Sequence, residues 1–257
     1  MTFFLLGLIA HVLADFVFQS DAMASQKAGT DYALFSHGAV VLVCSAVAFH
    51  PFGWGVSVVL AGFLAAAHLL IDRVRTAFDD KVSPFGRLLL FAGDQVLHVT
   101  VIVTAWQVAR PAVSANVAEF YSSSFLPAVM SAFRPHFIRA NLTLNRALAV
   151  VLAYLFVIFA GAQIVRCILD AFSVQVEPKL ATNAGRYIGM LERTLMLTLV
   201  LVNALPSIAF VLAAKSLARF RELGEMKFAE YYLIGTLSSS CIAVITGLLT
   251  RWALGAV

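Results

Sequence analysis

Long runs of apolar residues with few polar interruptions dominate the pattern of this 257-residue chain. Each run is close to the roughly 20 residues that a helix needs to cross a bilayer. The side chains are mainly Leu, Val, Ala and Phe with little strict alternation, which favours helices over a β-barrel. The pattern predicts an all-α, polytopic transmembrane bundle of about seven helices, at residues 3–19, 33–50, 54–73, 88–109, 147–169, 189–213 and 231–253.

The composition agrees with a membrane protein and excludes other classes. Hydrophobic residues make up 61% of the chain and charged residues 12%, whereas soluble domains are near half apolar and a quarter charged. Disordered and collagen-like chains are thereby excluded. The net charge of +4 is typical of Lys and Arg in cytoplasmic loops, so no nucleic-acid partner is expected. The three cysteines lie in apolar stretches without a shared short spacing, which argues against a disulfide framework.

The spacing of the runs divides the chain into three parts. Four helices are expected in residues 1–110, and three more in residues 147–257. The segment between them, 111–146, contains three prolines. That segment is compatible with a loop, an interfacial helix or a partial entry into the membrane.

Lys and Arg residues indicate which side of the membrane each connection faces. The connections after the first and third runs are basic, whereas the N-terminus and the link after the second run hold no Lys or Arg. Because basic loops stay in the cytoplasm, the N-terminus is predicted outside. The basic residues after the 189–213 run also look cytoplasmic, but strict alternation over seven helices puts them outside. Either the charge bias misleads there, or a further crossing or re-entrant segment lies in 110–146 or 166–188.

Three of the first four helices carry the same motif, a histidine and an aspartate four positions apart. At this spacing both side chains project from one face of a helix. Ionisable residues inside apolar helices are costly and mark functional sites by default. The pairs are His11 with Asp15, His68 with Asp72 and Asp94 with His98, and His37 near the start of the second helix is a fourth position.

The depth of these residues in the membrane matches as well. In an alternating bundle, the ends of helices 1 and 3 face the same side as the starts of helices 2 and 4. The aspartates and His37 lie near those termini, and the other three histidines lie one turn deeper, about 6 Å. Four consecutive helices can therefore direct seven nitrogen and oxygen ligands at one pocket. The charge bias places that pocket toward the cytoplasmic side.

Imidazoles and carboxylates are the ligands of zinc, manganese or iron in the cores of helix bundles. Zinc is the first expectation, with manganese or iron as alternatives. Seven candidate ligands exceed the three or four of one catalytic zinc, so the site suits two metal ions or includes aspartates that orient histidine rings. The same residues also suit buried His–Asp hydrogen bonds that lock helix packing, or a path for protons or ions.

Further polar side chains are candidates for orienting ligands or for binding a polar group of a substrate. They have ordinary alternatives: a glutamine at the membrane interface, a helix cap for a serine, or neutral pairing at a helix start for a glutamate. These candidates are Gln19, Gln95, Ser36 and Glu192.

The motifs of the first four helices resemble those of a bacterial inner-membrane family of unknown function, with H-x3-D-F-x2-Q, a lone His, H-x3-D and D-Q-x2-H. The resemblance covers about residues 5–100, and the second half looks like the extension in longer members of that family. It implies an inner-membrane location and supplies no activity. A more distant similarity is to bacterial membrane-bound metal-dependent hydrolases, which also combine His and Asp on transmembrane helices.

These observations predict first a membrane-embedded metal-dependent hydrolase of a lipid or lipid-linked ester, amide or phosphoryl group, with Asp15 or Asp94 as general base. The alternatives are a transporter of metal ions or protons, and a membrane interaction protein with a structural metal. The almost purely apolar outer half of the first four helices argues against a path. The oligomeric state stays open, a homo-oligomer included. Because Arg73 adjoins Asp72, Asp94→Ala is expected to remove more metal than Asp72→Ala.

Overall fold

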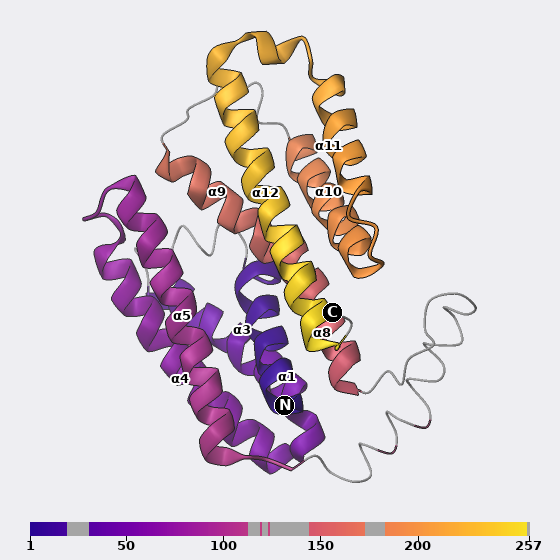
Figure 1. Ribbon diagram of the computed structural model, residues 1–257. Helices are drawn as coiled ribbons and strands as arrows, with labels where there is room; N and C mark the ends of the chain where they lie inside the picture. The colour runs from indigo at the N-terminus through magenta and orange to yellow at the C-terminus, as the bar shows by residue number, and fades with distance from the viewer. Residues whose placement is uncertain (20–30, 113–118, 120–122, 124–143, 173–182, 256–257) are drawn as a thin grey trace. The chain divides into compact units, whose positions relative to one another are not determined.

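The computed structural model describes residues 1–19, 31–112, 119, 123, 144–172 and 183–255. Every element in these ranges is helical, which confirms the all-α class (Figure 1). Most of the predicted connecting segment 111–146 lies outside the described residues. The helices are α1 (Thr2–Val12), η1 (Leu13–Val17), α3 (Asp31–Phe49), η2 (His50–Phe52), α4 (Trp54–Asp79), α5 (Pro84–Ala109), α8 (Leu144–Leu155), η4 (Phe156–Ala160), α9 (Gly161–Ala171), α10 (Asn183–Leu201), α11 (Ser207–Ala218), η5 (Glu222–Gly224) and α12 (Met226–Ala253).

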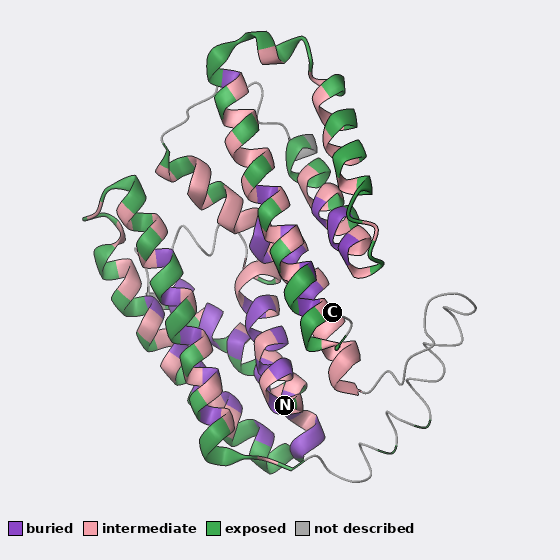
Figure 2. Cartoon of the chain, viewed as in Figure 1, coloured by how far each residue is buried: buried purple, intermediate pink, exposed green. Residues whose placement is uncertain are grey.

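Five helices of the described chain are long and apolar enough to cross a membrane: Tyr32–Phe52, Trp54–Asp79, Pro84–Ala109, Leu144–Ala171 and Met226–Ala253. The first apolar helix, Thr2–Val17, is shorter. Figure 2 shows exposed residues along the faces of α4, α5 and α12. Many of these residues are apolar, such as Val59 on α4, which is 71% exposed, and Val96 on α5, which is 64% exposed. A helix that is apolar on every face belongs in a lipid environment. The structure therefore supports an integral membrane protein.

The chain divides into two compact units, which comprise Met1–Asp80 with Ala92–Leu152, and Lys81–Phe91 with Ala153–Val257. In the first unit an aromatic cluster fills one end of the helix bundle. Phe3 stacks on Phe49 with ring centroids 4.3 Å apart, and Phe52 meets Phe3 edge-on at 5.5 Å. Leu64 and Ile102 complete this buried cluster, so that this end of the bundle is closed by side chains.

The first helix changes its winding where it reaches Asp15. The segment Leu13–Val17 is a π-helical turn, which the amide of Phe18 closes by donating to the carbonyl of Leu13 over 2.9 Å. The extra residue in such a turn alters the direction of the side chains that follow it, and π turns are frequent at functional sites. The sequence predicts one α-helix over residues 3–19. His11 lies in regular α-helix, as predicted, whereas Asp15 lies in the π-helical turn.

In the second unit, the predicted single crossing at 189–213 is wrong. Two helices, α10 and α11, lie side by side in opposite directions there (Figure 1). Lys215 near the end of α11 donates to Glu192 in the middle of α10 over 2.5 Å. Between the helices, Asn203 has a left-handed backbone with φ of 61°. Pro206 has no backbone N–H to donate, so it cannot continue the hydrogen bonding of α10.

This hairpin bears on the conflict between seven alternating helices and a cytoplasmic location of the basic residues after the 189–213 run. Because α11 runs back along α10, the basic residues that follow α11 lie toward the end from which α10 begins. The turn back occurs at residues 202–206. The two segments that the sequence suggested, 110–146 and 166–188, lie partly outside the described residues, and a further crossing there stays a prediction.

A buried arginine joins three helices of the second unit. Arg193 of α10 is 3% exposed. Its Nε donates to the carbonyl of Val157 over 2.7 Å and its Nη2 to that of Ile158 over 3.2 Å, while Nη1 lies 3.4 Å from Ser239 Oγ of α12. Both carbonyls belong to the π-helical segment η4, where the regular helical hydrogen bonds are interrupted. Arg193 therefore satisfies backbone groups that lipid cannot satisfy.

Candidate metal centre

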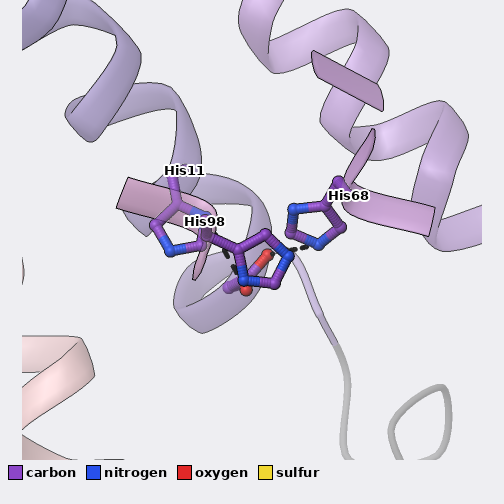
Figure 3. A group of neighbouring side chains, drawn as sticks. His11, His68 and His98 are labelled. Atoms are coloured by element: carbon purple, nitrogen blue, oxygen red, sulfur yellow. Dashed lines mark ion pairs between the residues drawn. The ribbon is translucent and has the colours of Figure 1, made fainter. Parts of the chain in front are cut away.

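The first unit brings together all seven ligands that the sequence predicts. They form three overlapping groups whose ligand atoms lie within 4.8 Å of one another, namely His11, Asp15, His68 and His98; His37, His68 and Asp72; and Asp72, Asp94 and His98. Figure 3 shows the imidazoles of His11, His68 and His98, which come from α1, α4 and α5, facing a common centre. Their role as metal ligands stays a prediction that this geometry supports.

Four ligand atoms form a compact set, in which five of the six separations are between 3.0 and 3.7 Å. The Nε2 atoms of His37 and His68 are 3.0 Å apart, and Asp15 Oδ1 lies 3.3 and 3.2 Å from them. Asp72 Oδ2 lies 3.7 and 3.6 Å from the same two nitrogens. Tetrahedral zinc with bonds of about 2.0–2.1 Å separates its ligand atoms by about 3.3 Å. The five separations are close to those of a tetrahedral zinc site, and we call these four side chains the tetrahedral set.

The close approach of α3 and α4 makes the contact between His37 and His68 possible. A Cβ atom on Gly38 would lie 2.7 Å from Cδ2 of Leu69. These two residues directly follow the two histidines in the sequence. Small residues let membrane helices pack backbone against side chain, and Gly38 does so beside the predicted site.

The remaining three ligands lie next to the tetrahedral set. The ring of His98 lies 4.0 Å from that of His68 and 5.0 Å from that of His11, measured between centroids. Asp15 connects the two sides, because its Oδ1 faces the tetrahedral set while its Oδ2 lies 3.7 Å from His11 Nδ1. A carboxylate with one oxygen on each side is suited to bridging two metal ions.

Several buried polar atoms of the centre make no hydrogen bond within the described chain. They include both ring nitrogens of His98, Nδ1 of His37, and one carboxylate oxygen each of Asp15 and Asp94. Buried polar atoms almost always have partners, and each one that lacks a partner costs free energy. A bound metal ion would account for the two carboxylate oxygens and for one ring nitrogen of His98, because nitrogen and carboxylate oxygen are its ligands. It would not account for His37 Nδ1, because His37 faces the set with Nε2.

The structure contradicts the exposure to water that the sequence suggested for Asp72. Asp72 is 3% exposed and contacts two histidines of the tetrahedral set, whereas its sequence neighbour Arg73 is exposed. Asp94 has a cationic contact, since its Oδ2 lies 3.4 Å from Arg75 Nη1, and it also accepts from Gln95 Nε2 over 3.0 Å. The premise for ranking Asp94 above Asp72 as a ligand is therefore wrong.

The other polar candidates differ in where they lie. Gln95 belongs to the centre, because its Oε1 is 3.1 Å from His11 Nε2 in addition to its bond to Asp94. Gln19 follows η1 and is half-buried, and its role stays a prediction. Ser36 donates to the carbonyl of Ala33 in its own helix, as an ordinary polar helix residue does. Glu192 lies in the second unit with Lys215, and its predicted place at the pocket rim stays a prediction.

A small pocket opens beside the three labelled histidines, on the side away from the aspartates. Apart from these histidines, its lining is nearly all apolar and comes from the next helical turns: Gly7, Val41, Ser45, Leu64, Val101 and Ile102.

Two polar residues near the centre, Ser45 and Arg75, are not among the candidates that the sequence predicts. The signal for both was helical spacing, since Ser45 follows His37 by two turns on α3 and Arg75 follows His68 by two turns on α4.

Comparison with known proteins agrees with the motifs of the first four helices. Residues 3–126 match the profile of a family described as "Protein of unknown function (DUF3307)". The match covers slightly under half of the chain and contains all seven predicted ligands. No curated protein and no solved structure matches the chain. The similarity to a family of unknown function is thus shown, and an activity has to be argued from the site.

Proposed function

We propose that this chain is a membrane-embedded metal-dependent hydrolase that uses zinc and acts on a lipid or lipid-linked ester, amide or phosphoryl group. The observation that carries the proposal is the tetrahedral set, four buried ligand atoms from three helix segments, with five separations close to those of a zinc site. Packing alone does not need four ionisable groups at one point in an apolar bundle.

The residues divide into holding and proton-transfer roles. Asp15, His37, His68 and Asp72 would hold the metal, which when bound lowers the pKa of a coordinated water and polarises the substrate. Asp94 suits the general base, because one of its oxygens is buried without a hydrogen bond while Gln95 and Arg75 hold the other. Its carboxylate would take the proton of the attacking water and pass it to the leaving group. His11 and His98 would hold a second ion or orient the substrate.

The closed end of the bundle favours hydrolysis over transport. A path for ions needs polar groups at both depths of the membrane. The bundle beyond the pocket instead holds Phe3, Phe49 and Phe52 in a buried aromatic cluster. An active site needs access from one side only, which the location of the polar residues allows. We further propose a bacterial inner membrane and a site toward the cytoplasm, on the basis of the motif resemblance and the basic loops.

The test measures metal and turnover on the same preparations. Wild-type protein and the control His50→Ala should contain near-stoichiometric zinc by mass spectrometry, whereas His68→Ala should not. His50 is a matched control because its ring binds the carbonyl of Val47 in a link outside the centre. Incubation with a bacterial lipid extract should yield new products that a chelator abolishes. Well-folded protein without metal overturns the proposal, as does metal flux into proteoliposomes without hydrolysis.

A further inference from the structure

One ring nitrogen of His98 has no partner even when the other binds a metal ion. Both nitrogens are buried and make no hydrogen bond within the described chain. Nδ1 lies 3.7 Å from Asp94 Oδ2, on the side of the predicted ligands. Nε2, on the other side of the ring, is therefore the nitrogen that needs a different partner. In metal sites such a nitrogen normally donates its hydrogen to an acceptor, and this bond fixes the orientation of the ring.

Ser45 provides a second buried polar group without a hydrogen bond. The residue is 3% exposed, and the described chain gives its hydroxyl no hydrogen-bond partner. A serine or threonine in a helix can donate to the carbonyl of the residue four positions earlier, as Thr100 does on α5. Ser45 instead lines the small pocket together with the three histidines labelled in Figure 3. A partner for its hydroxyl therefore has to lie inside the pocket.

The pocket has the size of one water molecule. Its volume is about 20 Å³, and about 10–15 Å³ suffices for one water, whereas an acyl chain or a headgroup does not fit. A buried water also needs at least two polar partners. The walls supply them in Ser45 and His98, while the lining residues other than Ser45 and the histidines offer no polar side chain.

We infer that the pocket binds one water molecule that joins His98 to Ser45, and that Ser45 is a positioning residue of the metal centre. The Nε2–H group of His98 donates to the water oxygen, and the water donates to Ser45 Oγ. Because this chain keeps the hydrogen on Nε2, the lone pair of Nδ1 faces the side of Asp94, where a metal ion can bind it. The inference rests on the proposed function and adds to it a residue that orients a ligand without contacting the metal.

Two substitutions of nearly identical shape separate the hydroxyl of Ser45 from its volume. Ser45→Thr keeps the hydroxyl, whereas Ser45→Val replaces it by a methyl group. Ser45→Val should raise the zinc Kd about tenfold, as the loss of a group that orients a ligand does, and Ser45→Thr should stay near wild type. The control is Ser57→Ala, since Ser57 is a buried serine of the same unit that donates to the carbonyl of Ala46. Equal losses in Ser45→Thr and Ser45→Val overturn the inference, because volume alone would then explain them.

The water itself is tested by determining the structure of the purified protein with and without zinc. In wild type, a density peak should lie at hydrogen-bond distance, about 2.5–3.2 Å, from both His98 Nε2 and Ser45 Oγ. Ser45→Val should lack this peak. A wild-type map that shows other buried waters but not this one overturns the inference, whether or not zinc is bound. Zinc content, measured on each preparation, tests the proposed function separately.

Discussion

The tetrahedral set predicts which aspartate matters more for metal affinity. Asp72 contributes an oxygen to the set, whereas Asp94 lies outside it and contacts Arg75 and Gln95. Replacing each by asparagine keeps its size and removes its charge. We expect Asp72→Asn to weaken zinc binding far more than Asp94→Asn, the reverse of the order suggested by the neighbouring Arg73.

The size of the effect follows from the number of ligands. Zinc bound by four protein ligands gains roughly 10–16 kcal/mol at neutral pH, which is about 3 kcal/mol for each ligand. Losing one carboxylate should therefore raise the zinc Kd by about 100-fold or more. Groups that only orient ligands change metal affinity by about 10- to 100-fold, and Asp94, held by two polar partners, should lie at the lower end. Hydrolysis should fall strongly in both variants, since Asp94 is the proposed base.

The assay is a competition for zinc with a chromophoric chelator on monodisperse, detergent-purified protein. Asp80→Asn is the matched control, because Asp80 is an exposed residue just after α4. Unfolding temperatures of the metal-free variants show whether a loss of affinity reflects a loss of folding. Metal-free Asp72→Asn should be at least as stable as wild type, because it places one fewer carboxylate in the centre. An Asp94→Asn variant that loses zinc affinity as much as Asp72→Asn does would refute the assignment of the set.

Three further predictions follow from the packing. Gly38→Ala should raise the zinc Kd about tenfold although it removes no ligand, because its Cβ would push α3 from Leu69; Gly62→Ala, where a Cβ meets nothing within 4 Å, should not. Arg193→Met should destabilise the protein by about 2 kcal/mol or more in denaturant titrations, since it leaves two carbonyls unsatisfied; Arg186→Met, an exposed change on the same helix, should be neutral. Glu222→Cys in a cysteine-free background should react with an impermeant maleimide in inside-out vesicles only. Labelling of intact cells would contradict the proposed cytoplasmic location of the residues after α11.

The helix class and the seven-residue cluster could be predicted from the sequence because lipid leaves few choices. Backbone groups inside a bilayer must bond within the same helix, so an apolar run of sufficient length indicates its own secondary structure. Ionisable residues are rare in such runs, which makes a pair such as His68 and Asp72 stand out. Their common depth then follows from the alternation of helix direction alone.

The surroundings of each ligand could not be predicted in the same way. Arg73 is next to Asp72 in the sequence, but adjacent residues on a helix point in different directions. Arg75 shares a face with His68 and reaches Asp94 on another helix, which requires knowing how α4 and α5 pack. The π turn at Asp15 has no signature in the hydrophobic period, because it inserts one residue into an otherwise apolar helix.

The hairpin of α10 and α11 shows why a conflict between two sequence signals carries information. Hydropathy counts apolar residues and does not register a reversal of direction, so the stretch 189–213 resembles one crossing. Within it, Asn203 and Pro206 form a turn, and Arg251 near the end of α12 donates to the Asn203 side chain. If the basic residues after α11 are cytoplasmic, the chain must reverse direction within or near this stretch. Hydropathy suggested one crossing without a reversal. The reversal of direction at this turn is compatible with the side of the membrane that the charge bias predicts, whereas a single crossing of 189–213 is not.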